Sequence, residues 1–280
     1  MEAAPPAALS AGRGPPLLYG TAWKAARTAE LVGQALAAGF RGIDTACQPK
    51  HYNEAGVGAG VATAVAGGLA RSELYLQTKF TPLDGHDPKR IPYDPQAPLD
   101  AQVAQSFAVS LSNLGTDYVD CLVLHSPLPT LPELMTVWTA MEQLAAAGRA
   151  RQLGISNCYS EELLATLVRS AQLPPRVVQN RFYAATGYDR GIRAYCRAHE
   201  IRYQSFWTLS ANAALLGHAE LGRLAARYAV TPAQVLLRYL TQVGVVPLTG
   251  TTSARHLRQA LAIFEFELAP AEVASLVQLT

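Results

Sequence analysis

The sequence predicts an α/β fold, a (β/α)8 or TIM barrel, built as one domain over residues 1–280. Short β-branched or apolar runs alternate with longer helical patterns from one end of the chain to the other, which is the order expected of a parallel sheet wrapped by helices. The 280 residues accommodate eight such units, the size of a single barrel. Apart from Asp120, residues 119–124 and 243–246 are apolar, as strands buried on both sides should be.

The strands are expected where short apolar runs lie between helical patterns. They fall at residues 16–19, 42–44, 74–78, 118–124, 150–155, 177–179, 201–205 and 245–248. Helical periodicity predicts helices at residues 28–40, 99–115, 131–148 and 160–172. Asp100 and Ser160 are candidate N-caps, and Gly115 and Gly148 are candidate glycines just past helix ends.

The long third connection, residues 79–98, is rich in proline and aspartate, as functional loops often are. The glycine-rich run at residues 56–60 follows a polar segment and not a strand. We therefore interpret it as a small-residue helix face and not as a dinucleotide-binding turn.

Composition excludes several classes of function. Half of the residues are hydrophobic and 16% are charged, which is typical of a globular chain with a large core. A net charge of +2 gives no footprint for nucleic acid or an anionic membrane, so we expect a small-molecule partner. Four scattered cysteines favour reduced thiols over a zinc site or a disulfide framework. The amino end lacks the pattern of a signal peptide, so we expect a cytoplasmic location.

Ionisable residues end three of the predicted strands, where the chemistry of such barrels is located. Asp44 and His125 directly follow apolar residues, and Lys79 follows the largely apolar run LYLQT. We expect them to converge at the mouth of the barrel, where desolvation and mutual charge perturb pKa values. An acid beside a buried lysine makes a charge pair.

The chain resembles the aldo-keto reductase family over nearly its whole length. The resemblance is carried by GFRGIDTACQPKHYNE (39–54), LYLQTKF (74–80), LGTDYVDCLVLHSP (114–127), GRARQLGISN (148–157) and VVQNRFY (177–183), in that order. It implies a barrel with a short N-terminal hairpin and an extra C-terminal helix. It also implies reduction of an aldehyde or ketone by hydride transfer from NADPH, in a protein that we expect to be a monomer without a metal.

The resemblance implies a catalytic tetrad of Asp44, Tyr52, Lys79 and His125. Tyr52 would be the general acid, and since a phenol is a poor acid near neutrality, Lys79 would favour its phenolate form. Asp44 would hold Lys79, and His125 would orient the carbonyl oxygen. The connection from Asp44 to Tyr52 is some three residues longer than is usual in the family and must bulge; Tyr93 is the fallback acid.

Cofactor contacts are implied in the same way. By our alignment Gln204 stands where the family has a tyrosine that stacks on the nicotinamide, with Trp207 or Phe206 as alternatives. Leu248 and His256 replace a lysine and an arginine that bind the 2'-phosphate of NADP; Arg255 and Arg258 could substitute, so NADP is expected and NAD is possible. The implied contacts as a whole are Gly20, Thr21, Trp23, Asp44, Ser156, Asn157, Gln179, Gln204, Ser205, Trp207, Leu209, Thr249, Gly250, Thr251, Thr252, Ser253, Arg255, His256 and Gln259.

The predicted substrate pocket is open, because Ser126 follows His125 where many relatives have a tryptophan. Its expected walls are Trp23, Tyr52, Phe80, His125 and Ser126. Two other functions remain open. Lys79 could form a Schiff base in an aldolase-type enzyme, or the barrel could bind its cofactor as a regulatory protein without turnover.

Overall fold

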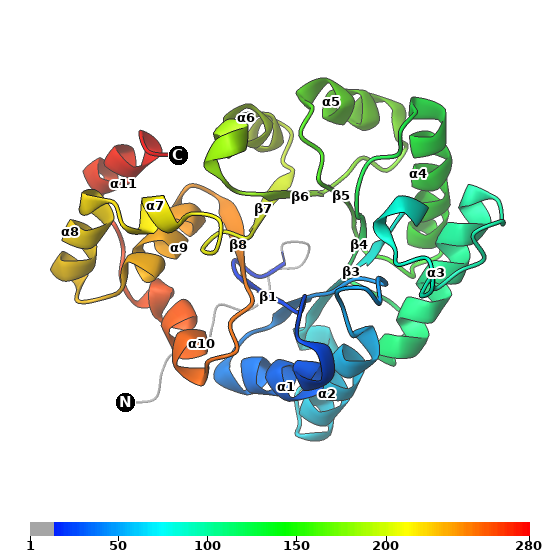
Figure 1. Cartoon of the computed structure of the whole chain (residues 1–280), viewed down its shortest axis with the longest axis horizontal. Coiled ribbons are helices and arrows are strands. Elements are labelled where there is room, and N and C mark those ends of the chain that lie inside the picture. Colours follow the sequence, from blue (N-terminus) through cyan, green and yellow to red (C-terminus); the bar gives the residue numbers. More distant parts are fainter. Residues whose placement is uncertain (1–13) are drawn as a thin grey trace.

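Eight parallel strands close into a barrel in sequence order, as Figure 1 shows for the computed structural model, which describes residues 14–280. Each strand pairs with the next, and β8 returns to β1 with Leu18 opposite Leu248. The predicted fold class is confirmed. The strands are β1 (Leu18–Gly20), β2 (Gly42–Asp44), β3 (Tyr75–Phe80), β4 (Cys121–Leu124), β5 (Leu153–Ser156), β6 (Val177–Arg181), β7 (Arg202–Phe206) and β8 (Val245–Thr249).

Helices surround the barrel (Figure 1). They are α1 (Thr28–Ala38), α2 (Glu54–Ala66), α3 (Leu99–Leu114), α4 (Leu131–Ala146), α5 (Glu161–Ser170), α6 (Arg190–Ala198), α7 (Ala213–Leu216), α8 (Ala219–Tyr228), α9 (Pro232–Gln242), α10 (Ala254–Leu261) and α11 (Pro270–Val277). Short 3₁₀ turns are η1 (Ala25–Arg27), η2 (Arg71–Glu73), η3 (Leu83–Gly85), η4 (Ala184–Asp189) and η5 (Ala262–Glu265). The extra C-terminal helix is α11. The expected N-terminal hairpin falls on residues 1–13, outside the described residues.

The interior of the barrel changes from apolar to polar along the strands. Alternate residues of a strand face the same side, and in β3 these are Tyr75, Gln77 and Lys79, all buried. Apolar side chains including Leu18 and Val123 pack around Tyr75 inside the barrel. Most polar groups of the interior therefore lie toward the carboxyl ends of the strands.

A larger apolar core lies between the barrel and its helices, and it includes Trp138, Ile155 and Leu236. Burial on both faces explains why β4 reads CLVL with every residue buried. The four cysteines are free and buried. Within residues 14–280 the structure has no helix with the length and apolar character needed to cross a bilayer.

The predicted helix ends are confirmed with one exception. Ser160 caps α5, its hydroxyl accepting from the Leu163 amide at 3.1 Å, and Gly115 ends α3 in the left-handed conformation at φ 63°. Gly148, at φ 73°, follows Ala147, which is the C-cap residue of α4. The assignment of Asp100 as an N-cap is wrong: Pro98 is the N-cap of α3, and Asp100 lies in its first turn, where its carboxylate favours the helix dipole.

The glycines of residues 56–60 lie on α2, as predicted. A side chain at Gly58 would collide with the Asn113 backbone carbonyl, and one at Gly60 would meet the Ala29 carbonyl at 2.8 Å. Glycine therefore allows α2 to approach both α3 and α1 closely. The helix begins at Asn53, whose side chain accepts from the Gly56 amide at 2.9 Å.

We predict that Gly58→Ala lowers the free energy of unfolding by about 1–3 kcal/mol, because the added methyl group must displace backbone. Gly33→Ala is the matched control, since Gly33 lies in α1 with open space around the position of a methyl group, and a gain of up to about 1 kcal/mol is expected there. Denaturant titration measures both values. Equal stability changes in the two variants would contradict the close approach at Gly58.

Candidate active site

A cavity of about 610 Å³ opens at the carboxyl ends of the strands. Residues from seven strands or the segments that follow them contribute to it, as the barrel architecture predicts. The lining residues are Gly20, Ala22, Trp23, Lys24, Asp44, His51, Tyr52, His125, Ser156, Asn157, Gln179, Arg181, Phe206, Trp207, Thr208, Leu209, Ser210, Leu248, Thr249, Gly250 and Thr251.

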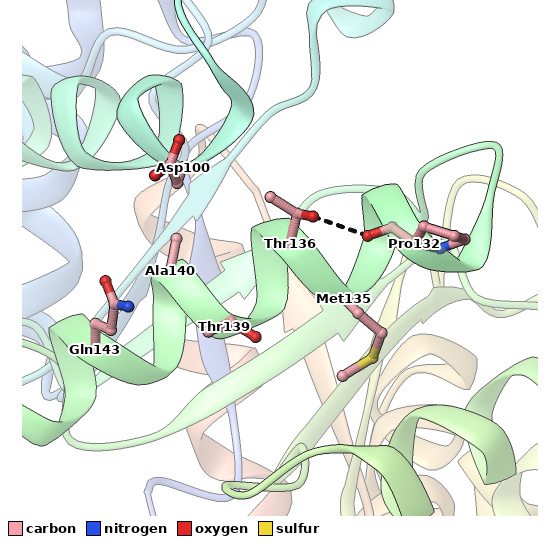
Figure 2. A pocket seen from close by; sticks show the side chains of 7 residues that line it. All are labelled: Asp100, Pro132, Met135, Thr136, Thr139, Ala140 and Gln143. Atoms are coloured by element: carbon pink, nitrogen blue, oxygen red, sulfur yellow. Dashed lines mark hydrogen bonds between the residues drawn. The ribbon is translucent and has the colours of Figure 1, made fainter.

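A second hollow of about 380 Å³ lies outside the barrel, along α4 and the start of α3 (Figure 2). In Figure 2 the Thr136 hydroxyl donates to the Pro132 carbonyl one turn earlier in α4, at 2.9 Å. Asp100 is the one ionisable residue in its lining. The hollow along α4 brings no acid–base pair together. The cavity at the mouth of the barrel is therefore the candidate active site.

The floor of the mouth cavity is a buried ion pair. Lys79 Nζ lies 2.6 Å from Asp44 Oδ1 and also donates to the Thr45 carbonyl at 2.8 Å. Both side chains are almost fully buried. A buried pair of this kind persists only when further hydrogen bonds satisfy the charges, so the surroundings of Asp44 decide whether it is stable.

Three glutamines complete these hydrogen bonds. Gln77 Nε2 and Gln179 Nε2 donate to Asp44 Oδ1 at 2.7 and 2.9 Å. The same two nitrogens donate to Gln204 Oε1 at 2.8 and 2.9 Å, and Gln204 Nε2 donates back to Gln77 Oε1 at 3.0 Å. The layer joins β2, β3, β6 and β7 and fixes the orientation of each amide group.

The connection between Asp44 and Tyr52 folds back on itself. The Cys47 amide donates to the Lys79 carbonyl at 3.2 Å, and the Tyr52 amide donates to the Gln48 carbonyl at 3.1 Å. Gln48 Nε2 holds the turn by donating to the Gly85 carbonyl at 2.7 Å. This turn brings Tyr52 to the cavity, with Lys79 Nζ 5.5 Å from the centre of its ring.

His125 lies beside Tyr52, with 6.0 Å between the ring centres and the rings edge to face. Its Nδ1 is 2.7 Å from the Thr81 hydroxyl. Burial lowers the pKa of His125 well below 6.5, and the charge of Lys79 lowers it further. The imidazole is therefore neutral near pH 7.

The pKa of Tyr52 differs from the sequence-based expectation. We expected Lys79 to favour the phenolate, but burial raises the pKa of this phenol well above 10, and the negative charge of Asp44 raises it further. The reason is geometric, because Lys79 directs its hydrogen bonds to Asp44 and the Thr45 carbonyl. Tyr52 therefore remains protonated near neutral pH.

Several residues of the predicted site do not line the cavity. Thr21 and Lys79 lie beneath it, and the Thr21 hydroxyl donates to the Asp44 carbonyl at 2.9 Å. Phe80 is buried against Tyr93, with 5.7 Å between ring centres. Tyr93 donates to the Thr81 carbonyl instead of facing the mouth. The residues that the structure places away from the lining are Thr21, Lys79, Phe80, Tyr93, Ser126, Gln204, Ser205, Thr252, Ser253, Arg255, His256 and Gln259.

Strand β7 and the residue after it bring to the cavity the alternative residues, Phe206 and Trp207, and not Gln204. Gln204 faces inward and is buried in the glutamine layer, and Ser205 is buried with its hydroxyl 2.8 Å from that of Thr208. The position of Gln204 is therefore wrong for stacking on a ligand in the mouth. Phe206 and Trp207 line the cavity instead, and Trp207 is 48% exposed.

The segment after β8 places hydroxyl and amide groups at the rim. Thr249, Gly250 and Thr251 line the cavity, and Ser253 caps α10 by accepting from the His256 amide at 3.4 Å. Lys24 Nζ donates to the Gly250 carbonyl from the opposite side. This rim combines a cation, threonine hydroxyl groups and a helix N-terminus, a combination that suits an anion.

Strained backbone surrounds the cavity. Trp23, Asn157 and Trp207 have φ values of 62°, 54° and 54°, in the left-handed region that residues with side chains avoid. The Trp23 amide donates to the His51 carbonyl at 2.8 Å, and the two rings contact each other with centres 3.9 Å apart and planes tilted by 41°. Such strain persists where the surrounding structure enforces it, most often at functional sites.

Sequence reasoning missed several residues of the site, among them four with polar or charged side chains that bear on its chemistry. Lys24, His51 and Arg181 line the cavity, and Gln77 supports Asp44. The period of two along a strand was the signal for two of them: Gln77 lies two residues before Lys79, and Arg181 two residues after Gln179.

Comparison with known proteins places the chain in a family. Residues 16–280 match the model of the aldo/keto reductase family. An "aldo-keto reductase" of Mycobacterium avium is 33% identical over 242 residues, covering 86% of this chain and 78% of that protein. The "uncharacterized oxidoreductase YtbE" of Bacillus subtilis is 29% identical over 238 residues, covering 85% and 78%.

Solved structures agree with this assignment. An aldo/keto reductase of Brucella melitensis superimposes with a TM-score of 0.83 at 28% identity, covering 99% of this chain and 100% of that one. An aldo-keto reductase of Bombyx mori, solved in complex with NADP, gives a TM-score of 0.81 at 27% identity, covering 99% and 93%. The chain belongs to the aldo/keto reductase family, and it is an oxidoreductase.

Behind Tyr52 lies a second buried acid, Glu54, the first residue of α2. Its carboxyl group accepts from the Thr78 hydroxyl at 2.5 Å and from Asn113 Nδ2 at 3.2 Å. Burial raises the pKa of Glu54 above its ordinary value, because it outweighs these hydrogen bonds. A raised pKa means that ionisation of Glu54 opposes folding: its contribution to stability is complete below the pKa in the unfolded chain and is lost as pH rises through the folded value.

We therefore predict that Glu54→Gln stabilises the protein increasingly as pH rises from 5 to 8, by about 2–4 °C in Tm at the upper end. Thermal unfolding across this range measures the difference from the wild type. Glu162→Gln is the control, because Glu162 is exposed in the first turn of α5 and should show no such trend. A difference that is constant with pH would contradict the assigned ionisation.

Proposed function

We propose that this protein reduces the carbonyl group of an aldehyde or ketone with NADPH, with Tyr52 as the proton donor. The observation that carries the proposal is the convergence of Tyr52, His125 and the Asp44–Lys79 pair at one cavity. The aldo-keto reductase of Bombyx mori solved with NADP supports the choice of cofactor. Family resemblance and the geometry of the cavity together support the assignment of these four residues as the catalytic tetrad.

Tyr52 is suited to protonate a developing alkoxide. Its raised pKa keeps the proton on the phenol, and an alkoxide is basic enough to take it. After transfer the phenolate lies near the ammonium group of Lys79, 5.5 Å from the ring centre to Nζ, which stabilises the new charge. Asp44 keeps Lys79 in place through the 2.6 Å ion pair.

His125 is suited to orient the carbonyl oxygen. We take the Thr81 hydroxyl as the donor to Nδ1, at 2.7 Å, so that the neutral ring carries its proton on Nε2. A neutral Nε2–H donates a hydrogen bond to the carbonyl oxygen without competing with Tyr52 for proton transfer. Thr81 thereby selects the useful tautomer of His125.

The residues of β5 and β6 fit a nicotinamide carboxamide. Gln179 Nε2 donates to Asp44 and Gln204. These hydrogen bonds fix the orientation of the Gln179 amide group, so that Oε1 is left as an acceptor for an amide N–H. Asn157 is fixed by donating to the His125 carbonyl at 2.8 Å. The chemistry that bound NADPH supplies is a hydride. Ser156, Asn157 and Gln179 would hold its carboxamide, and Phe206 or Trp207 would pack on its ring.

The rim after β8 would hold the phosphates. Lys24, Thr249, Gly250 and Thr251 line the cavity there, with Thr252 and the cap residue Ser253 continuing toward α10. Arg255, His256 and Gln259 extend along that helix, and Arg255 and Arg258 are exposed. We assign these two arginines to the 2'-phosphate of NADP, because a guanidinium matches phosphate geometry.

The alternative functions gain less support. A Schiff-base enzyme needs a lysine that reaches its substrate, whereas Lys79 lies beneath the cavity with its ammonium group committed to Asp44 and Thr45. A regulatory barrel without turnover predicts tight cofactor binding and no reduction of any carbonyl. Oxidation of NADPH and NADH against a panel of aldehydes and ketones distinguishes these functions.

We predict that Tyr52→Phe lowers kcat for carbonyl reduction by about 10²–10⁴-fold, the usual contribution of a general acid. The dissociation constant of NADPH, measured by fluorescence titration, should stay within about twofold, since the phenol is not assigned to the cofactor. Tyr118→Phe is the control, because Tyr118 lies before β4 against Arg71 and Arg151. Full activity of Tyr52→Phe would remove Tyr52 from its role.

We further predict that replacing Arg255 and Arg258 together by glutamine raises the dissociation constant of NADPH about tenfold and leaves that of NADH unchanged, since charge-assisted hydrogen bonds to the 2'-phosphate are lost. Arg197→Gln is the control on the exposed surface of α6. Equal weakening of both cofactors would place the two arginines on a group that NADPH and NADH share.

A further inference from the structure

The positive and negative charges of the residues that line the cavity do not cancel. Asp44 is the one acidic residue in the lining, and Lys79 already neutralises it. Burial and the nearby Lys50 and Arg90 lower the pKa of His51, so that ring adds no charge near neutral pH. Two cations remain, Lys24 and Arg181, and the cavity is therefore positive.

These two cations differ in what already satisfies them. Lys24 Nζ donates to the Gly250 carbonyl at the rim after β8. Among residues 14–280 no carboxylate forms an ion pair with Arg181. No acceptor in this part of the chain forms a hydrogen bond with its guanidinium group, and the Nε atom is buried. A guanidinium that lines a cavity and has no anionic partner among these residues is available to an anionic ligand.

Aromatic side chains hold the Arg181 guanidinium in place. Its central carbon lies 4.1 Å from the centre of the Trp207 ring, 5.2 Å from that of Tyr183 and 6.0 Å from that of Phe206. Stacking occupies the faces of the planar group and leaves its N–H edges for an acceptor. Since Arg181 follows Gln179 by two residues on β6, both face the cavity, with Arg181 nearer its opening.

We propose that Arg181 binds a carboxylate of the substrate, so that this reductase acts on carbonyl compounds that carry an acid group. The inference rests on the proposed function. A carboxylate offers two oxygens that match the guanidinium fork, and arginine stays charged throughout the physiological pH range. The carbonyl group would lie at Tyr52 and His125, and the acid group would extend toward β6.

The cofactor phosphates are a less suitable partner for Arg181. Lys24 and the hydroxyl-rich segment from Thr249 to the cap at Ser253 lie together at β1 and β8, which are three and two strands away from β6 in the barrel order. The neighbours of Arg181 are aromatic rings that suit an organic acid better than a strongly hydrated pyrophosphate. We therefore assign Arg181 to the substrate.

The test compares 3- and 4-carboxybenzaldehyde with their methyl esters, which have nearly the same size and no charge. The wild type should reduce each acid with a higher kcat/KM than its ester. Arg181→Gln should lower kcat/KM for the acids by about ten- to a hundredfold, as expected when a hydrogen bond between charged groups is lost, and leave the esters within about twofold. Arg181→Lys keeps the positive charge but lacks the paired N–H donors of a guanidinium group, so its kcat/KM for the acids should lie between those of the wild type and Arg181→Gln.

Two further measurements complete the test. The dissociation constant of NADPH should be unchanged in Arg181→Gln, and Arg169→Gln, on the exposed surface of α5, should behave like the wild type. Equal losses for acids and esters together with weaker NADPH binding would place Arg181 on the cofactor and overturn the proposal, as would unchanged kinetics. If the wild type reduces the esters but does not prefer the acids, the substrate class is wrong and the reductase assignment stands. No turnover of any of the four compounds overturns both.

Discussion

The buried ion pair between Asp44 and Lys79 is the constraint around which the site is organised. Two charges inside a barrel are unstable unless every remaining hydrogen-bonding group near them is satisfied. Here three donors meet at Asp44 Oδ1, from Lys79, Gln77 and Gln179. Removing one partner of such a pair typically costs about 3–5 kcal/mol. The floor of the cavity is therefore one interdependent unit that spans β2, β3 and β6.

This unit also determines which atoms the site presents to a ligand. Because Gln204 and Asp44 engage the nitrogen of Gln179, only its oxygen is left for the mouth. Because Lys79 points at Asp44, its charge affects Tyr52 and His125 through space and not through a direct hydrogen bond. The consequence is a protonated phenol beside a neutral imidazole, a combination suited to donating hydrogen bonds to a carbonyl oxygen.

The outer part of the cavity is built differently. Its residues lie on loops and strand ends, and the backbone of Trp23, Asn157 and Trp207 is left-handed there. The neighbouring contacts that enforce these conformations, such as the hydrogen bond from Trp23 to the His51 carbonyl, also place the indole rings at the rim. The hydrogen-bonded floor would position the reacting groups, and the aromatic and cationic side chains of the rim would select the substrate.

The sequence by itself determined the barrel, its strand ends and the convergence of Asp44, Lys79 and His125, because the period of apolar residues and the common edge of parallel strands are local properties. It also indicated Tyr52, whose position then depended on the turn held by Gln48 and Gly85. Only the tertiary structure decided that Gln204 is buried in the glutamine layer while Phe206 and Trp207 line the mouth. Gln204 and Phe206 face the same side of β7, so their difference lies in depth along the barrel, which the packing of the neighbouring strands sets. It likewise decided that burial raises the pKa of Tyr52 and that, within residues 14–280, no acid pairs with Arg181. Desolvation and charge balance depend on groups that are distant in sequence and meet only when the barrel closes.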